Sequence, residues 1–98
     1  MELRDKVVVV TGGASGIGMG LCRRFRGEQV RGLVIADLNG EAASALANEL
    51  DAKSVQLDVR DESAIAAMVA ETESEFGQVD LFCSNAGVLD LDGGDYRA

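Results

Sequence analysis

The segment TGGASGIG, residues 11–18, decides the fold of this chain, because it places four glycines in eight positions directly after the apolar run VVVV, residues 7–10. A strand that leads into a helix presents the free N–H groups and positive dipole end of that helix at the carboxyl edge of the sheet, where they favour an anion. A phosphate must approach this backbone closely. We therefore predict that Gly12 permits a tight turn, Gly16 leaves room for a pyrophosphate, and Gly18 lets the helix pack closely on the sheet.

Length and charge limit the class of protein. The chain has 98 residues, enough for one domain, and a formal net charge of −8, which argues against nucleic acid or an anionic membrane surface as a partner. It has no histidine, so imidazole metal ligands and histidine bases are excluded. Cys22 and Cys83 lack metal-ligand or redox spacing, and we expect reduced core thiols. The charged start, without an apolar signal segment, predicts a cytoplasmic protein.

Short apolar runs alternate with helical patterns along the chain. We expect strands at 7–10, 33–36, 54–59 and 81–83, and helices near 16–27, 41–50 and 62–76. Helical crossovers between short strands are typical of a parallel sheet covered by helices. The sequence therefore predicts an α/β fold, the N-terminal half of a Rossmann-like doubly wound parallel sheet, with residues 1–98 as one dinucleotide-binding half-domain.

The polarity of the strands predicts their order. The first two runs are wholly apolar, as in central strands, whereas residues 54–59 alternate polar and apolar side chains, which is typical of an edge. Strand order 3-2-1-4 satisfies this, with the first two helices on one face and the third on the other. One helix cannot cover the second face of four strands, so we expect exposed apolar surface beside the fourth strand.

We expect each predicted helix to have one buried face and identifiable ends. Asn39 and Asp61 are the expected N-caps of the second and third helices, and Gly77 the expected left-handed end of the third. The predicted buried positions are, helix by helix, Ile17, Leu21, Cys22 and Phe25; then Ala42, Ala45, Leu46 and Leu50; then Ile65, Met68, Val69, Thr72 and Phe76.

The residues after the glycines indicate which nucleotide is bound. Met19 stands where a nucleoside-triphosphate loop needs lysine, which leaves a dinucleotide. Asp37 ends the second strand, where its carboxylate can accept hydrogen bonds from both ribose hydroxyls and would repel a 2′-phosphate, so NAD is favoured over NADP. Two plainer interpretations stay open: the glycines merely connect strand to helix, and Asp37 is a turn residue.

Three motifs resemble the short-chain dehydrogenase/reductase family across nearly the whole chain. Residues 11–18 match its TGxxxGxG pattern, Asp58-Val59 its adenine-contacting pair, and Asn85-Ala86-Gly87 its NAG motif. Asp58 can instead be a solvated turn residue, and a structural role for the NAG motif, through hydrogen bonds between Asn85 and Thr11, is as well supported as cofactor contact. The expected NAD-binding residues are Gly12, Ser15, Gly16, Ile17, Gly18, Asp37, Leu38, Asp58, Val59, Asn85, Ala86 and Gly87.

The resemblance implies hydride transfer between a nicotinamide and a small alcohol or carbonyl substrate, in a protein that is often a homo-oligomer. The serine and Tyr-x-x-x-Lys residues that carry this chemistry in the family find no match here, because Tyr96 has no lysine four positions later. We therefore assign no catalytic residue and no metal ligand, and we interpret the chain as the cofactor half of a longer enzyme. A non-catalytic dinucleotide-binding module that acts through a partner, and a remnant that binds nothing, are the alternatives.

Overall fold

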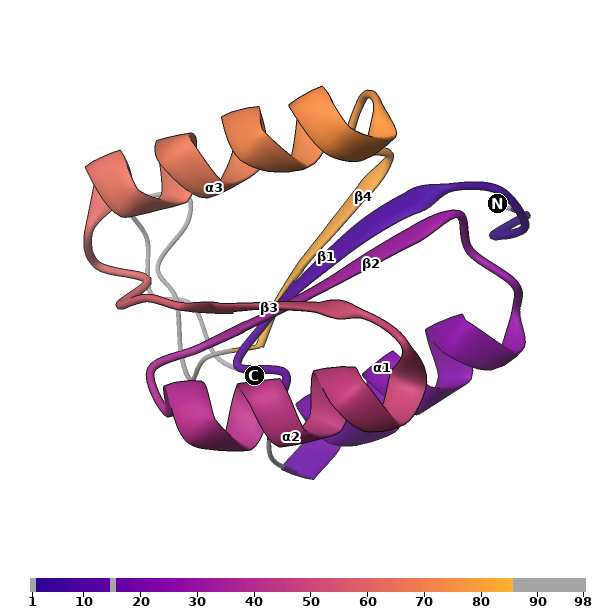
Figure 1. The fold of residues 1–98 in the computed structure, drawn as a ribbon, viewed down its shortest axis with the longest axis horizontal. Helices are drawn as coiled ribbons and strands as arrows, with labels where there is room; N and C mark the ends of the chain where they lie inside the picture. The colour runs from indigo at the N-terminus through magenta and orange to yellow at the C-terminus, as the bar shows by residue number, and fades with distance from the viewer. Residues whose placement is uncertain (1, 15, 86–98) are drawn as a thin grey trace, which may run out of the picture.

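A four-stranded parallel sheet with helices on both faces makes up the fold (Figure 1). A computed structural model describes residues 2–14 and 16–85. The strand order is β3-β2-β1-β4, which confirms the predicted order and the edge position of the third strand. The elements in chain order are β1 (Val7–Thr11), α1 (Gly16–Gly27), β2 (Gly32–Asp37), α2 (Gly40–Leu50), β3 (Lys53–Gln56), α3 (Glu62–Phe76) and β4 (Leu81–Ser84).

The central strands are buried because they carry apolar side chains on both faces. All five residues of β1 are buried, as are the first five of β2. β1 pairs with β2 without interruption from Val7 opposite Gly32 to Thr11 opposite Ala36. The segment that leads from α1 into β2, residues 28–32, therefore does not disturb the pairing of β2 with β1. Asp37 directly follows Ala36 at the carboxyl end of β2.

The helices divide between the two faces as predicted. α1 and α2 lie on one side of the sheet and α3 on the other (Figure 1). Val8 and Val10 join the core beneath α1 and α2, whereas Val9 joins the core beneath α3, because successive strand side chains point to opposite faces. Asn39 and Asp61 are the N-caps of α2 and α3, through hydrogen bonds from the N–H groups of Ala42 (3.0 Å) and Ala64 (3.1 Å).

Two predicted core positions are wrong. The side chain of Ile17 is 75% exposed, so it does not belong to the buried face of α1, which consists of Gly18, Cys22 and Phe25. Ala45 is exposed, while Ala43 and Ala47 are buried, so the apolar stripe of α2 is rotated from the predicted one.

Two predicted boundaries also differ. β3 ends at Gln56, although the N–H of Leu57 still donates to the carbonyl of Asp37 at 3.1 Å. Gly77 has φ 102° and ψ −172°, so it ends α3 with a positive φ but not in the left-handed helical conformation. That ψ is extended and directs the chain toward β4.

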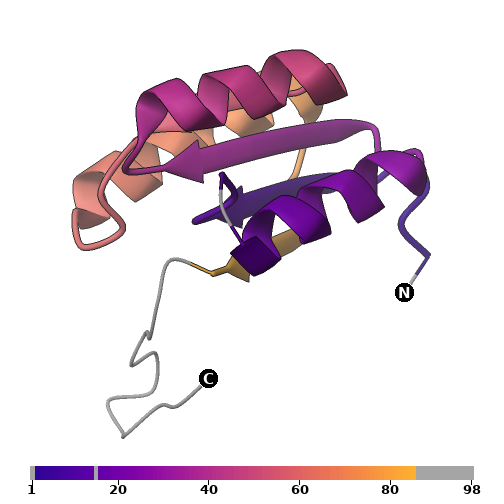
Figure 2. The same cartoon turned by 90° about the horizontal axis from the view of Figure 1, so that it is seen from below.

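The carboxyl ends of β1, β2 and β4 meet at one edge of the molecule, where α1 begins (Figure 2). Within residues 2–14 and 16–85, β4 pairs only with β1 and is an edge strand. Its Phe82, opposite Val9 on the α3 face, is 39% exposed. This exposure agrees with the expected exposed apolar surface beside the fourth strand. The candidate site lies elsewhere, at the carboxyl edge where α1 begins.

Candidate dinucleotide site

The glycine turn between β1 and α1 uses backbone conformations that favour glycine. Gly12 has φ 65° and Gly16 has φ 54°, both in the left-handed region. The N–H of Gly13 donates to the carbonyl of Ala36 at 3.3 Å, which ties the turn to the end of β2. The predicted tight turn at Gly12 is present.

Gly18 is the point of closest approach between α1 and the turn. A Cβ atom on Gly18 would lie 2.1 Å from the carbonyl oxygen of Gly12 and 2.8 Å from Nδ2 of Asn85. At Gly16, by contrast, no heavy atom of the described residues other than its chain neighbours and helix backbone lies within 4 Å of such a Cβ. The turn is thus closely packed at Gly18 and open at Gly16, and the close contact of Gly18 is with the turn and Asn85, whereas the sequence predicted packing on the sheet.

Asn85 joins β4 to the glycine turn. Its N–H donates to the carbonyl of Thr11 at 3.0 Å and approaches Oγ1 of Thr11 at 3.3 Å. Thr11 is fully buried, and its hydroxyl also lies 3.5 Å from the carbonyl of Cys83 and 3.4 Å from Oγ of Ser84. The hydrogen bonds expected between Asn85 and Thr11 are therefore confirmed.

Asp37 connects the end of β2 to the same turn. Its Oδ2 accepts from the N–H of Ala14 at 3.0 Å, and its Oδ1 accepts from the N–H of Asn39 at 2.9 Å. The second bond has the geometry of the turn residue that the sequence left open as an alternative. The first bond joins residues 23 positions apart and was not predicted.

Asp58 lies just beyond β3 and is paired with Arg60. Oδ1 of Asp58 accepts from the backbone N–H of Arg60 at 2.9 Å and from Nε of its guanidinium group at 3.1 Å. Oδ2 of Asp58 accepts from Nη2 of the same group at 2.8 Å. These hydrogen bonds lower the pKa of the Asp58 carboxyl to about 2, so it is ionised at neutral pH. Val59 packs against the core beneath α3, which leaves its backbone as the group able to meet a ligand.

Two large apolar side chains stand exposed around the turn. Ile17 opens α1, and Leu38, which is 64% exposed, follows Asp37. Exposed apolar side chains near polar backbone groups can pack against the apolar surface of a ligand. Three further predicted residues, Ser15, Ala86 and Gly87, and also Tyr96, lie outside the described residues.

Gly13 is a close-packing position that sequence reasoning missed. A Cβ atom there would lie 3.0 Å from Cγ2 of Ile35 and 3.1 Å from Sγ of Cys22. The doubled glycine at 12–13 is the only sequence signal of this contact. Cys22 and Cys83 are both free, and burial followed by the proximity of Cys83 raises the pKa of the Cys22 thiol to about 11. Both properties agree with the expected reduced core thiols.

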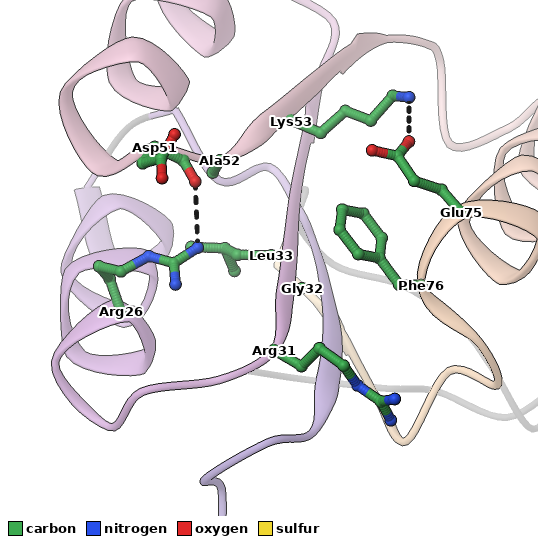
Figure 3. A pocket seen from close by; sticks show the side chains of 9 residues that line it. All are labelled: Arg26, Arg31, Gly32, Leu33, Asp51, Ala52, Lys53, Glu75 and Phe76. Carbon is green, nitrogen blue, oxygen red and sulfur yellow. Dashed lines mark hydrogen bonds and ion pairs between the residues drawn. The ribbon is translucent and has the colours of Figure 1, made fainter.

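A separate pocket of about 500 Å³ lies at the opposite, amino edge of the sheet (Figure 3). β2 and β3 begin there, at Gly32 and Lys53. Lys53 pairs with Glu75, and Arg26 donates to the carbonyls of Leu50 and Asp51. Lys53 and Arg26 thus already have partners, and the pocket lies at the end of the strands away from the glycine turn.

The chain is similar to known proteins over most of its length. A family model described as short chain dehydrogenase matches residues 6–96. The chain is 40% identical over 90 residues to a (+)-cis,trans-nepetalactol synthase of Nepeta racemosa, covering 90% of this chain and 33% of the relative. It is 38% identical over 93 residues to galactitol 2-dehydrogenase of Agrobacterium fabrum, covering 93% of this chain and 36% of the relative. The chain thus spans about a third of the length of the curated relatives it matches.

A solved structure has a fold similar to that of this chain. The 3-ketoacyl-(acyl-carrier-protein) reductase from Brucella melitensis, complexed with NADH, matches with a TM-score of 0.81 and 35% identity, covering 88% of this chain and 36% of that chain. The fold defines the Rossmann-like α/β class. More narrowly, the chain belongs to the short-chain dehydrogenase/reductase family. Among the described helices, none has the length and apolar character required to cross a membrane.

Proposed function

We propose that this chain supplies the NAD(H)-binding part of an oxidoreductase that transfers a hydride between the nicotinamide and an alcohol or carbonyl substrate. The observation that carries the proposal is that one sheet edge holds an open glycine turn at the start of α1 beside the carboxylate of Asp37. Backbone N–H groups at a helix start favour a pyrophosphate, and a carboxylate at the end of the second strand suits a ribose.

The proposed contacts follow the geometry of the carboxyl edge. The turn at Gly12 and Gly16 would hold the pyrophosphate, and Asp37 the adenosine ribose. The exposed side chains of Ile17 and Leu38 stand where they can pack against ribose or base. The remaining proposed NAD-binding residues are Ser15, Gly18, Asp58, Val59, Asn85, Ala86 and Gly87.

NAD is proposed over NADP on electrostatic grounds. The Asp37 carboxylate, which already accepts two backbone N–H groups, would face the additional phosphate of NADP at close range. Arg60, which follows β3, already forms two side-chain hydrogen bonds and an ion pair with Asp58. A solved relative complexed with NADH supports the same choice.

We also propose that residues 1–98 are the cofactor half of a longer enzyme whose catalytic residues lie elsewhere in the polypeptide. The share of the relatives that the chain matches, about a third, supports this. Substrate oxidation or reduction and homo-oligomer formation remain predictions from the family resemblance, and cytoplasmic location remains a prediction from the charged start of the sequence. A module that binds the dinucleotide without catalysis is the alternative.

Calorimetric titration with NAD and NADP tests the proposal. We expect NAD to bind at least about tenfold more tightly than NADP, because that ratio corresponds to about 1.4 kcal/mol, a modest charge repulsion. Asp37→Ser should reduce the preference. Gly20→Ala in α1, where a Cβ meets no described atom within 4 Å beyond the helix backbone and chain neighbours, is the matched control and should bind NAD as the parent does. Absence of binding of either dinucleotide would refute the proposed function.

A further inference from the structure

We propose that Asp37 is also a positioning residue for the glycine turn, holding it in the phosphate-binding conformation through the N–H of Ala14. This inference rests on the proposed function and extends the role of Asp37 from the ribose to the pyrophosphate. The bond from Ala14 N to Oδ2 is 3.0 Å long and joins the turn after β1 to the end of β2.

The Ala14 N–H needs this partner. Ala14 is only 7% exposed, and a buried backbone N–H left without an acceptor is costly. Its neighbour Gly13 reaches β2 through a longer bond, 3.3 Å to the carbonyl of Ala36. The Ala14 bond is shorter and has a side-chain carboxylate oxygen as its acceptor, so it is the stronger of the two links between the turn and β2.

Positioning the turn does not prevent Asp37 from binding a ribose. Its two oxygens offer about four acceptor sites. Among the described residues, Oδ2 accepts from Ala14 and Oδ1 from Asn39. Each oxygen therefore keeps an acceptor site that a ribose hydroxyl can use. One side chain then serves both parts of the dinucleotide.

Inorganic pyrophosphate separates the two roles, because it has no ribose. We would compare Asp37→Asn and Asp37→Ala by competition of pyrophosphate with NAD. Both variants remove the negative charge, but only asparagine keeps an oxygen that can accept from Ala14, in exchange for the bond from the N–H of Asn39. We expect pyrophosphate to bind the alanine variant about fivefold more weakly than the asparagine variant, as for loss of one ordinary hydrogen bond. Equal pyrophosphate affinity in the two variants would overturn the proposal.

Amide hydrogen exchange of the ligand-free protein gives a second readout that requires no cofactor. The Ala14 amide should exchange about tenfold faster in Asp37→Ala than in the parent, with Asp37→Asn between them. The Asn85 amide, bonded to Thr11 on the other side of β1, is the internal control and should be unchanged. Equal acceleration at Asn85 would mean a global loss of stability and would contradict a local role.

These readouts also separate this inference from the proposed function. If the parent binds neither NAD nor pyrophosphate, the proposed function fails, and the Ala14 exchange rates then decide the positioning role alone. If Asp37→Ala loses NAD but keeps both pyrophosphate affinity and slow Ala14 exchange, Asp37 contacts only the ribose, and the positioning role is refuted.

Discussion

The Cα of Gly18 faces the carbonyl oxygen of Gly12 so closely that a Cβ atom on Gly18 would lie 2.1 Å from that oxygen. Real Cβ atoms do not approach a backbone oxygen this closely, and neither partner can move as a side chain can. The first turn of α1 is therefore pressed directly onto the loop that enters it. The absence of one methyl group sets the distance between helix and turn.

Gly18→Ala should consequently destabilise the protein and displace the turn. We expect a loss of about 1–3 kcal/mol in the free energy of unfolding, as for overpacking at a rigid site, together with weaker NAD binding. Chemical denaturation and calorimetry measure the two effects. Gly20→Ala, two residues further along α1, should be neutral or slightly stabilising, since alanine is the better helix former. Equal stability of the two variants would show that the close approach is not real.

Gly16 should separate cofactor binding from folding. Its φ of 54° makes any side chain strained, by about 1–2 kcal/mol, but no described atom beyond its immediate neighbours stands near its Cβ position. Gly16→Val should therefore remain folded while losing at least about tenfold in NAD affinity, because the side chain occupies the space proposed for pyrophosphate. Circular dichroism and calorimetry check the two parts. Full NAD affinity in this variant would refute the phosphate cradle.

A substitution at Gly32, at the amino edge of the sheet, should change stability without changing NAD affinity. A Cβ atom there would lie 2.6 Å from Cγ of Phe76. Gly32→Ala should lower the free energy of unfolding by about 1–3 kcal/mol while the folded protein keeps its NAD affinity. The double variant Gly32→Ala/Phe76→Leu should recover part of the loss. A change in NAD affinity at this distant position would contradict the location of the site.

The ion pair of Asp58 with Arg60 predicts a pH effect. Hydrogen bonds from Arg60 lower the pKa of the Asp58 carboxyl from 3.8 to about 2. Because the folded pKa lies below the unfolded one, the contribution to stability is fully present above about pH 4 and is lost as the pH falls through about 2. Arg60→Gln should raise this pKa toward its ordinary value, as NMR titration of the carboxyl carbon would measure. An unchanged pKa would show that the pair does not form in solution.

The two thiols should differ in reactivity. Burial raises the pKa of both, and that of Cys22 reaches about 11, so Cys22 is protonated at neutral pH. Cys22 is fully buried, whereas Cys83 is partly exposed. Iodoacetamide should therefore label Cys83 first in the native protein, and both at similar rates in denaturant. Mass spectrometry of the labelled peptides distinguishes these outcomes, and faster labelling of Cys22 would contradict the observed burial.

Local patterns in the sequence were sufficient for the order and type of the elements. The apolar runs, the caps at Asn39 and Asp61, and the glycine turn each depend on neighbouring residues. The alternation around Val55 and Leu57 is typical of an edge strand, and the predicted order, which satisfies it, is the observed one. The errors at Ile17 and Ala45 concern which positions of a helix face the sheet, and periodicity alone does not fix this.

The sequence by itself determined that a glycine turn follows a buried strand and that an acid ends the next strand. Only the tertiary structure decided that the two are bonded, through Ala14 and Asp37, and that Gly12, Gly18 and Asn85 meet at one point. The physical reason is that composition and spacing specify the conformation of each segment, whereas contacts between residues many positions apart depend on how the sheet brings the strand ends together.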